Sequence, residues 1–137
     1  MITLVLGGAR SGKSTIAERL AGSAAPPGGS VTYVATIWPN VGAPDADLDA
    51  RVDAHRSRRP DDWQTIEPPY DLCEVLATRE GVLLLDSLGS WLTAQPDMVV
   101  DQPALIAALV GRAAPTIVVS DEVGWGVHPE TPIGRRF

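Results

Sequence analysis

The chain has 137 residues, 45% of them hydrophobic, and a formal net charge of −6. This length suits one domain that buries about two thirds of its unfolded surface, and the negative charge excludes a broad basic surface for nucleic acid. No apolar run approaches the length of a membrane span, and the N-terminus lacks the charged region of a signal peptide. A single cysteine, Cys73, cannot form an internal disulfide, so we expect a cytoplasmic protein. From the charge and the missing membrane span we expect neither nucleic-acid nor membrane partners.

Strand-like and helix-like segments alternate along the chain. Apolar runs predict strands at residues 2–6, 31–35, 63–66, 82–85 and 116–119. Apolar residues at helical spacing predict helices at residues 14–25, 45–58, 70–78 and 103–113. Because two of the strand segments are apolar almost throughout, they are typical of parallel strands covered on both faces. We therefore predict one α/β domain over residues 1–137, with an open, mainly parallel sheet and helices on both faces, like the phosphate-loop NTPases.

A complete phosphate-loop motif, G-x-x-x-x-G-K-[ST], follows the first predicted strand. It comprises Gly7, Gly8, Ala9, Arg10, Ser11, Gly12, Lys13 and Ser14. In such motifs backbone N–H groups and the N-terminus of the next helix converge on phosphate, and the lysine reaches the phosphates. Lys13 is the only lysine among 11 basic residues, which fits a position that requires a compact ammonium. A chance match in a glycine-rich loop is the alternative interpretation.

The predicted strand at residues 82–85 is followed directly by a carboxylate, Asp86. In phosphate-loop proteins such an aspartate holds Mg²⁺ beside the loop, directly or through water, while the loop hydroxyl binds the metal from the other side. Ser14 would supply that hydroxyl in this chain. The alternative is an aspartate that caps the turn after the strand.

Charged residues surround a histidine in the predicted helix at residues 45–58. Helical spacing places Val52 and His55 on one face, with Arg51 and Arg58 on either side of the histidine. Arginines in these positions would neutralise phosphate oxygens and lower the pKa of His55, so that a neutral imidazole could attack phosphorus. A half-buried histidine in a charged surface helix is the more ordinary interpretation of this segment alone.

Two further segments lie where ligands bind in open α/β sheets. Glu67 follows the predicted strand at residues 63–66, where it could accept hydrogen bonds from a base or a ribose, or simply be solvated. Residues 121–137 hold three glycines and two prolines, and we expect no helix or strand in them. Residues 121–130 are typical of a mobile cover over a site, hinged at glycine.

Taken in order, these segments resemble the bifunctional adenosylcobinamide kinase/adenosylcobinamide-phosphate guanylyltransferase family of cobalamin biosynthesis. The resemblance runs over the whole chain. Many families share the phosphate loop, whereas the segments around His55 and Glu122 are much more specific. The matching stretches are residues 6–14, 33–36, 51–56, 59–60, 63–67, 84–88, 91–92, 118–124, 129–130 and 135–137. Asp121 stands where the family usually has asparagine.

The resemblance implies two reactions in one site. ATP or GTP phosphorylates adenosylcobinamide; GTP then gives GMP to an enzyme histidine, and GMP passes to adenosylcobinamide phosphate. By motif position His55 would carry GMP, Lys13 would be the second catalytic residue, and Ser14 and Asp86 would hold Mg²⁺. The resemblance also implies nucleotide contacts from Gly7, Gly8, Ala9, Arg10, Ser11, Gly12, Lys13, Ser14, Thr36, Ile37, Trp38, Arg56, Ser57, Arg58, Arg59, Glu67 and Asp86.

Members of this family associate as trimers and continue, after the position of Phe137, with a further helix and a last hydrophobic strand. The resemblance makes a homotrimer one expectation, and it implies an exposed sheet edge or an uncovered apolar face in residues 1–137. The sequence leaves two other functions open. One is a phosphate-loop kinase of another small molecule, in which His55 is structural. The other is a nucleotide-binding remnant without turnover.

Overall fold

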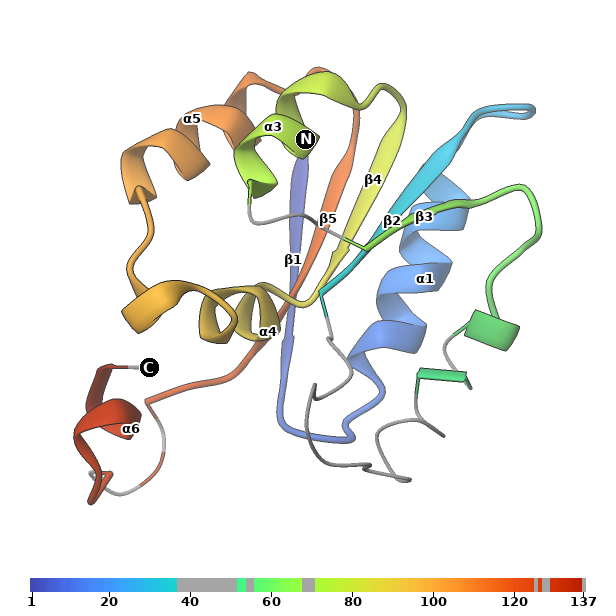
Figure 1. Cartoon of the computed structure of the whole chain (residues 1–137). Helices are drawn as coiled ribbons and strands as arrows, with labels where there is room; N and C mark the ends of the chain where they lie inside the picture. The colour runs from blue at the N-terminus through green and yellow to red at the C-terminus, as the bar shows by residue number, and fades with distance from the viewer. Residues whose placement is uncertain (37–51, 54–55, 68–70, 125, 127–128, 137) are drawn as a thin grey trace.

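The described residues form a five-stranded sheet in which all paired strands are parallel (Figure 1). The computed structural model describes residues 1–36, 52–53, 56–67, 71–124, 126 and 129–136. The strands are β1 (Ile2–Gly7), β2 (Val31–Ala35), β3 (Gln64–Ile66), β4 (Val82–Asp86) and β5 (Thr116–Asp121). Their order across the sheet is β1-β5-β4-β2-β3. Because all the strands are parallel, their carboxyl ends meet at one edge, where ligands bind in open α/β sheets.

Helices cover both faces of this sheet. The helix α1 (Lys13–Ala24) lies on one face, and α3 (Leu72–Thr78), α4 (Leu88–Thr93) and α5 (Gln102–Gly111) lie on the other (Figure 1). Every residue of β4 is buried. Val82 and Leu84 pack in the core beneath α1, while Leu83 and Leu85 pack in the core on the opposite face. This two-sided burial is the reason that the strand is apolar without alternation.

The five predicted strands and the predicted fold class are confirmed. Helices α1, α3 and α5 correspond to the segments predicted at 14–25, 70–78 and 103–113. Aspartates fix two of their starts: Asp71 accepts a hydrogen bond from the Glu74 N–H at 3.0 Å, and Asp101 accepts one from the Ala104 N–H at 2.9 Å. Most of the helix predicted at 45–58 lies outside the described residues, although residues 52–53 and 56–57 are helical.

The prediction that residues 121–137 hold no helix or strand is wrong. Strand β5 extends to Asp121, and a short helix, α6, spans Pro132–Arg136. Thr131 Oγ1 accepts a hydrogen bond from the Gly134 N–H at 3.2 Å, and a proline suits the first position of a helix. Local capping therefore forms α6 without the apolar spacing that the prediction relied on. The predicted elements also omit α4 and the 3₁₀ turn η1 (Pro96–Met98).

Strand β1 lies at an edge of the described sheet and pairs there with β5. Val5 packs against the core beneath α1, so Ile2, Leu4 and Leu6 point to the opposite face. These three side chains are 45%, 54% and 56% exposed. The described helices thus cover β1 on one face much more completely than on the other. Among the described residues, no helix is both long enough and apolar enough to span a bilayer.

Candidate nucleotide site

The phosphate loop connects the end of β1 to the start of α1, as the motif predicts. Gly7 ends the strand, and Gly12 precedes the helix with a φ of 83°, in the region that favours glycine. A Cβ atom added to Gly7 would lie 2.5 Å from Ser11 Oγ, so any larger residue there would force the Ser11 hydroxyl to move. Among the residues that the structure describes, no side chain caps the start of α1. Its first N–H groups are therefore in the arrangement that binds anions at helix N-termini.

The Lys13 ammonium is held between the phosphate loop and the end of β5. It donates a hydrogen bond to the Gly8 carbonyl oxygen at 3.1 Å and forms an ion pair with Asp121 Oδ1 at 2.8 Å. The lysine side chain is 13% exposed and that of Asp121 is 39% exposed. Asp121 is the residue of β5 that pairs with Gly7. The register of the sheet therefore brings this carboxylate to the loop.

Asp86 ends β4 and is 6% exposed. Its Oδ2 accepts a buried hydrogen bond of 2.6 Å from the hydroxyl of Tyr33 on β2. Burial, together with the neighbouring Asp86 carboxylate, raises the pKa of Tyr33 far above its ordinary value, so the phenol stays protonated and donates. The cap of α4 comes from Ser87, whose Oγ accepts from the Ser90 N–H at 3.3 Å. The structure thus gives the capping role to Ser87 and leaves Asp86 beside the phosphate loop.

A cavity of about 430 Å³, here named the phosphate-loop cavity, lies at the carboxyl edge of the sheet. It unites most of the phosphate loop with the predicted metal residues Ser14 and Asp86 and with Arg58. Its lining residues are Ala9, Arg10, Ser11, Gly12, Lys13, Ser14, Thr15, Arg58, Asp86, Ser87, Ser90 and Asp121. Oxygen ligands such as the Ser14 hydroxyl and the Asp86 carboxylate are those that Mg²⁺ prefers, so this donor set fits the predicted metal.

Thr36 joins the end of β2 to the end of β4 through hydrogen bonds. Its hydroxyl donates to the Ser87 carbonyl oxygen at 2.7 Å and accepts from the Ser87 N–H at 2.6 Å. Its own N–H donates to the Asp86 carbonyl oxygen at 3.0 Å. Thr36 is 1% exposed, and these contacts hold the backbone around Asp86 in place. Its predicted nucleotide contact stays a prediction. Ile37 and Trp38, which were predicted with it, lie outside the described residues.

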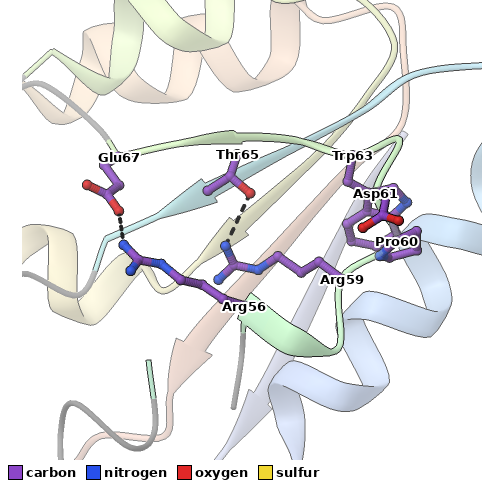
Figure 2. Close-up of a pocket in the computed structure, with 7 residues that line it drawn as sticks. All are labelled: Arg56, Arg59, Pro60, Asp61, Trp63, Thr65 and Glu67. Carbon is purple, nitrogen blue, oxygen red and sulfur yellow. Dashed lines mark hydrogen bonds and ion pairs between the residues drawn. The ribbon is translucent and has the colours of Figure 1, made fainter. Parts of the chain in front are cut away.

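A second cavity, of about 510 Å³ and here named the arginine cavity, lies beside β3 (Figure 2). Arg56 forms a hydrogen-bonded ion pair with Glu67, and Arg59 donates to Thr65 Oγ1 at 3.2 Å. The Arg59 guanidinium also lies 3.6 Å from the centre of the Tyr33 ring. The cavity is lined by Arg56, Arg59, Pro60, Asp61, Trp63, Thr65 and Glu67. Three of the predicted nucleotide contacts therefore share one cavity.

Arg58 connects this part of the chain to α1. Its guanidinium bonds the Glu18 carboxylate, with Nε 3.3 Å and Nη2 3.4 Å from the two oxygens. Arg58 lines the phosphate-loop cavity, whereas Arg56 and Arg59 line the arginine cavity. The turn at residues 56–59 thus contributes to both. Ser57 is exposed. His55, the predicted GMP carrier, lies outside the described residues.

Several site residues are absent from the predicted set: Tyr33, Thr65, Ser87, Ser90 and Asp121. Asp86 is identified as a carboxylate directly after an apolar strand, and a similar signal is present at Asp121, which follows the apolar run at residues 117–119 after one intervening serine. It could have placed Asp121 at the same sheet edge. No comparable signal exists for Tyr33, because its role depends on the neighbouring strand that supplies Asp86.

Comparison with known proteins matches residues 3–137 to a family described as cobinamide kinase / cobinamide phosphate guanyltransferase. The chain is 39% identical over 148 aligned positions to the bifunctional adenosylcobalamin biosynthesis protein CobP of Pseudomonas aeruginosa, covering all of this chain and 80% of the relative. It is 33% and 34% identical over 159 positions to the proteins named CobU of Escherichia coli and Salmonella typhimurium, covering all of this chain and 83% of each. With its phosphate loop and Asp86 lining one cavity of a parallel sheet, the chain belongs to the cobinamide kinase / cobinamide phosphate guanyltransferase family of enzymes.

Proposed function

We propose that this chain phosphorylates adenosylcobinamide with ATP or GTP and then transfers GMP from GTP to adenosylcobinamide phosphate. One observation carries this proposal: the phosphate loop, Asp86 and Arg58 line one cavity in a chain that matches the family along residues 3–137. The family description names a kinase and a guanyltransferase activity, and the three relatives are named bifunctional proteins of adenosylcobalamin biosynthesis, which supports the proposal of two reactions.

In the kinase reaction, the aminopropanol hydroxyl of adenosylcobinamide attacks the γ-phosphorus, and the nucleoside diphosphate leaves. The loop N–H groups and the Lys13 ammonium would hold the phosphates, because both are concentrated at the start of α1. Ser14 and Asp86 would hold Mg²⁺, directly or through water, and the metal would neutralise charge on the transferring phosphate. Tyr33 and Thr36 keep Asp86 in position for this task.

In the guanylyl reaction, the His55 imidazole would attack the α-phosphorus of GTP, forming a P–N bond as pyrophosphate leaves. A phosphate oxygen of adenosylcobinamide phosphate would then attack the same phosphorus, and the P–N bond would break. His55 immediately precedes Arg56 in the sequence, and Arg56, Arg58 and Arg59 line the two cavities. These guanidinium groups would neutralise phosphate oxygens during the transfer. Glu67 would accept hydrogen bonds from the base or ribose.

Covalent labelling tests the histidine step. The protein is incubated with Mg²⁺ and GTP labelled at the α-phosphate, and we expect acid-labile, base-stable label on His55. His55→Ala should lose this label but keep measurable phosphorylation of adenosylcobinamide, because phosphoryl transfer requires positioning and charge rather than a covalent histidine. His128→Ala, which removes the other histidine of the chain, is the control and should keep the label. Label on His55→Ala would show that another residue is the nucleophile.

A further inference from the structure

The ion pair between Lys13 and Asp121 places a negative charge inside the anion-binding part of the phosphate-loop cavity. The two charged atoms are 2.8 Å apart, and both residues line that cavity. The position of Asp121 follows from the sheet, because Asp121 pairs with Gly7 and the next N–H, that of Glu122, donates to the Gly7 carbonyl oxygen at 3.3 Å. The backbone that carries this carboxylate is therefore paired with the residue from which the phosphate loop begins.

This arrangement affects different forms of a nucleotide to different extents. The lysine of a phosphate loop must reach the β- and γ-phosphates, so a bound triphosphate competes with Asp121 for the Lys13 ammonium. Once Lys13 turns to the phosphates, the Asp121 carboxylate remains close to a second group of negative charges, and like charges at such distances repel. A metal-complexed triphosphate brings its own divalent cation, which offsets this repulsion. A metal-free triphosphate brings no such cation, so the repulsion is not offset.

We propose that Asp121 is a specificity-determining residue that makes this site discriminate against metal-free nucleotides in favour of their Mg²⁺ complexes. The inference rests on the proposed function insofar as the phosphate loop must bind nucleotide. It goes beyond that function by assigning a role to a carboxylate that is neither a predicted phosphate contact nor a predicted metal ligand. The same carboxylate keeps Lys13 beside the Gly8 carbonyl oxygen before nucleotide arrives.

Calorimetric titration of Asp121→Asn tests the proposal. GTP binding is measured once with Mg²⁺ and once with EDTA, and the readout is the ratio of the metal-free dissociation constant to that with Mg²⁺. Because Asp121 is partly exposed, we expect this ratio to fall by about fivefold, mainly through tighter binding of metal-free GTP. A ratio equal to that of the unmodified protein would overturn the proposal.

Three further variants separate this effect from simpler ones. Glu122→Gln removes the same charge from the next, exposed position and should leave the ratio unchanged, whereas Asp121→Glu keeps the charge and should largely preserve it. A merely structural ion pair would change the free energy of unfolding without changing the ratio. Lys13→Ala shows whether a negative result contradicts the proposed nucleotide site or only the inference about Asp121. Undiminished GTP binding by Lys13→Ala would contradict the proposed nucleotide site itself, but weakened binding with an unchanged ratio in Asp121→Asn would contradict only this inference.

Discussion

The two cavities on either side of the turn at residues 56–59 are built in different ways. In the phosphate-loop cavity, regular backbone structure positions the binding groups. They are the glycine-containing loop, the N-terminus of α1, and the carboxylates carried by the last residues of β4 and β5. The arginine cavity rests on side chains reaching across from a turn to the three-residue strand β3. Its central ion pair is solvent-accessible, with Arg56 54% and Glu67 59% exposed.

This difference predicts different energetic roles. Groups fixed by the sheet keep their geometry without a ligand, so removing one of them should produce a large loss of affinity. Exposed ion pairs contribute little to stability, because solvent and salt screen them and their side chains lose freedom in forming them. We therefore expect the phosphate-loop cavity to supply most of the affinity for nucleotide, and the arginine cavity to supply mainly selection between nucleotides.

The largest effect should come from Lys13→Ala. Removing this charge-assisted contact should cost roughly 1.5–3 kcal/mol of binding free energy, which weakens GTP binding by about tenfold or more. Calorimetry with Mg²⁺ present measures the change. Arg19→Ala removes an equal charge from an exposed position of the same helix and should leave the affinity within about twofold. Equal losses in the two variants would mean that the overall field, rather than the loop geometry, attracts the nucleotide.

A smaller effect should come from Tyr33, the side chain that contacts both regions. Tyr33→Phe keeps the ring beneath Arg59 but removes the buried hydrogen bond to Asp86. We expect a loss of about 2 kcal/mol in the free energy of unfolding, measured in urea. Tyr33→Leu should lose about a further 0.5–1 kcal/mol, because it also removes the cation–π contact with Arg59. Equal stabilities of Tyr33→Phe and the unmodified protein would show that Asp86 is held without Tyr33.

The pH dependence of stability gives a second measurement on the same tyrosine. Burial, and then the Asp86 charge, raise the pKa of Tyr33 in the folded protein above its ordinary value of 10.0. The folded state therefore retains a proton that the unfolded state releases, so this contribution is fully present below about pH 10 and is lost as the pH rises further. The unmodified protein should lose stability above pH 10 more steeply than Tyr33→Phe. Parallel profiles would contradict this assignment.

The smallest effect should come from the Arg56–Glu67 pair. A double-mutant cycle with Arg56→Ala and Glu67→Gln should give a coupling below about 1 kcal/mol in the free energy of unfolding, decreasing further at high salt. The same variants should clearly change the ratio of GTP to ATP affinity, while they change the free energy of unfolding only slightly. A large coupling together with an unchanged ratio would reverse the comparison between the two cavities.

The fold was predictable because its signals are local. The uninterrupted apolar residues of β4 require cover on both faces, and the motif from Gly7 to Ser14 requires a strand before it and a helix after it. Short elements were less predictable. Helix α4 depends on the Ser87 cap, and α6 on Thr131, since neither helix is long enough for apolar residues to repeat at helical spacing.

The sequence alone specified the phosphate loop, the carboxylate at the end of β4 and the parallel sheet that brings them together, because each depends on a motif or a periodicity within a few residues. Which side chains hold these groups depends on strand order. Asp121 reaches Lys13 because β5 lies between β1 and β4, and Tyr33 reaches Asp86 because β2 pairs with β4. Such contacts join residues separated by as many as 108 positions for Lys13 and Asp121 (121 − 13), so no local pattern encodes them. They arise from the packing of the folded chain.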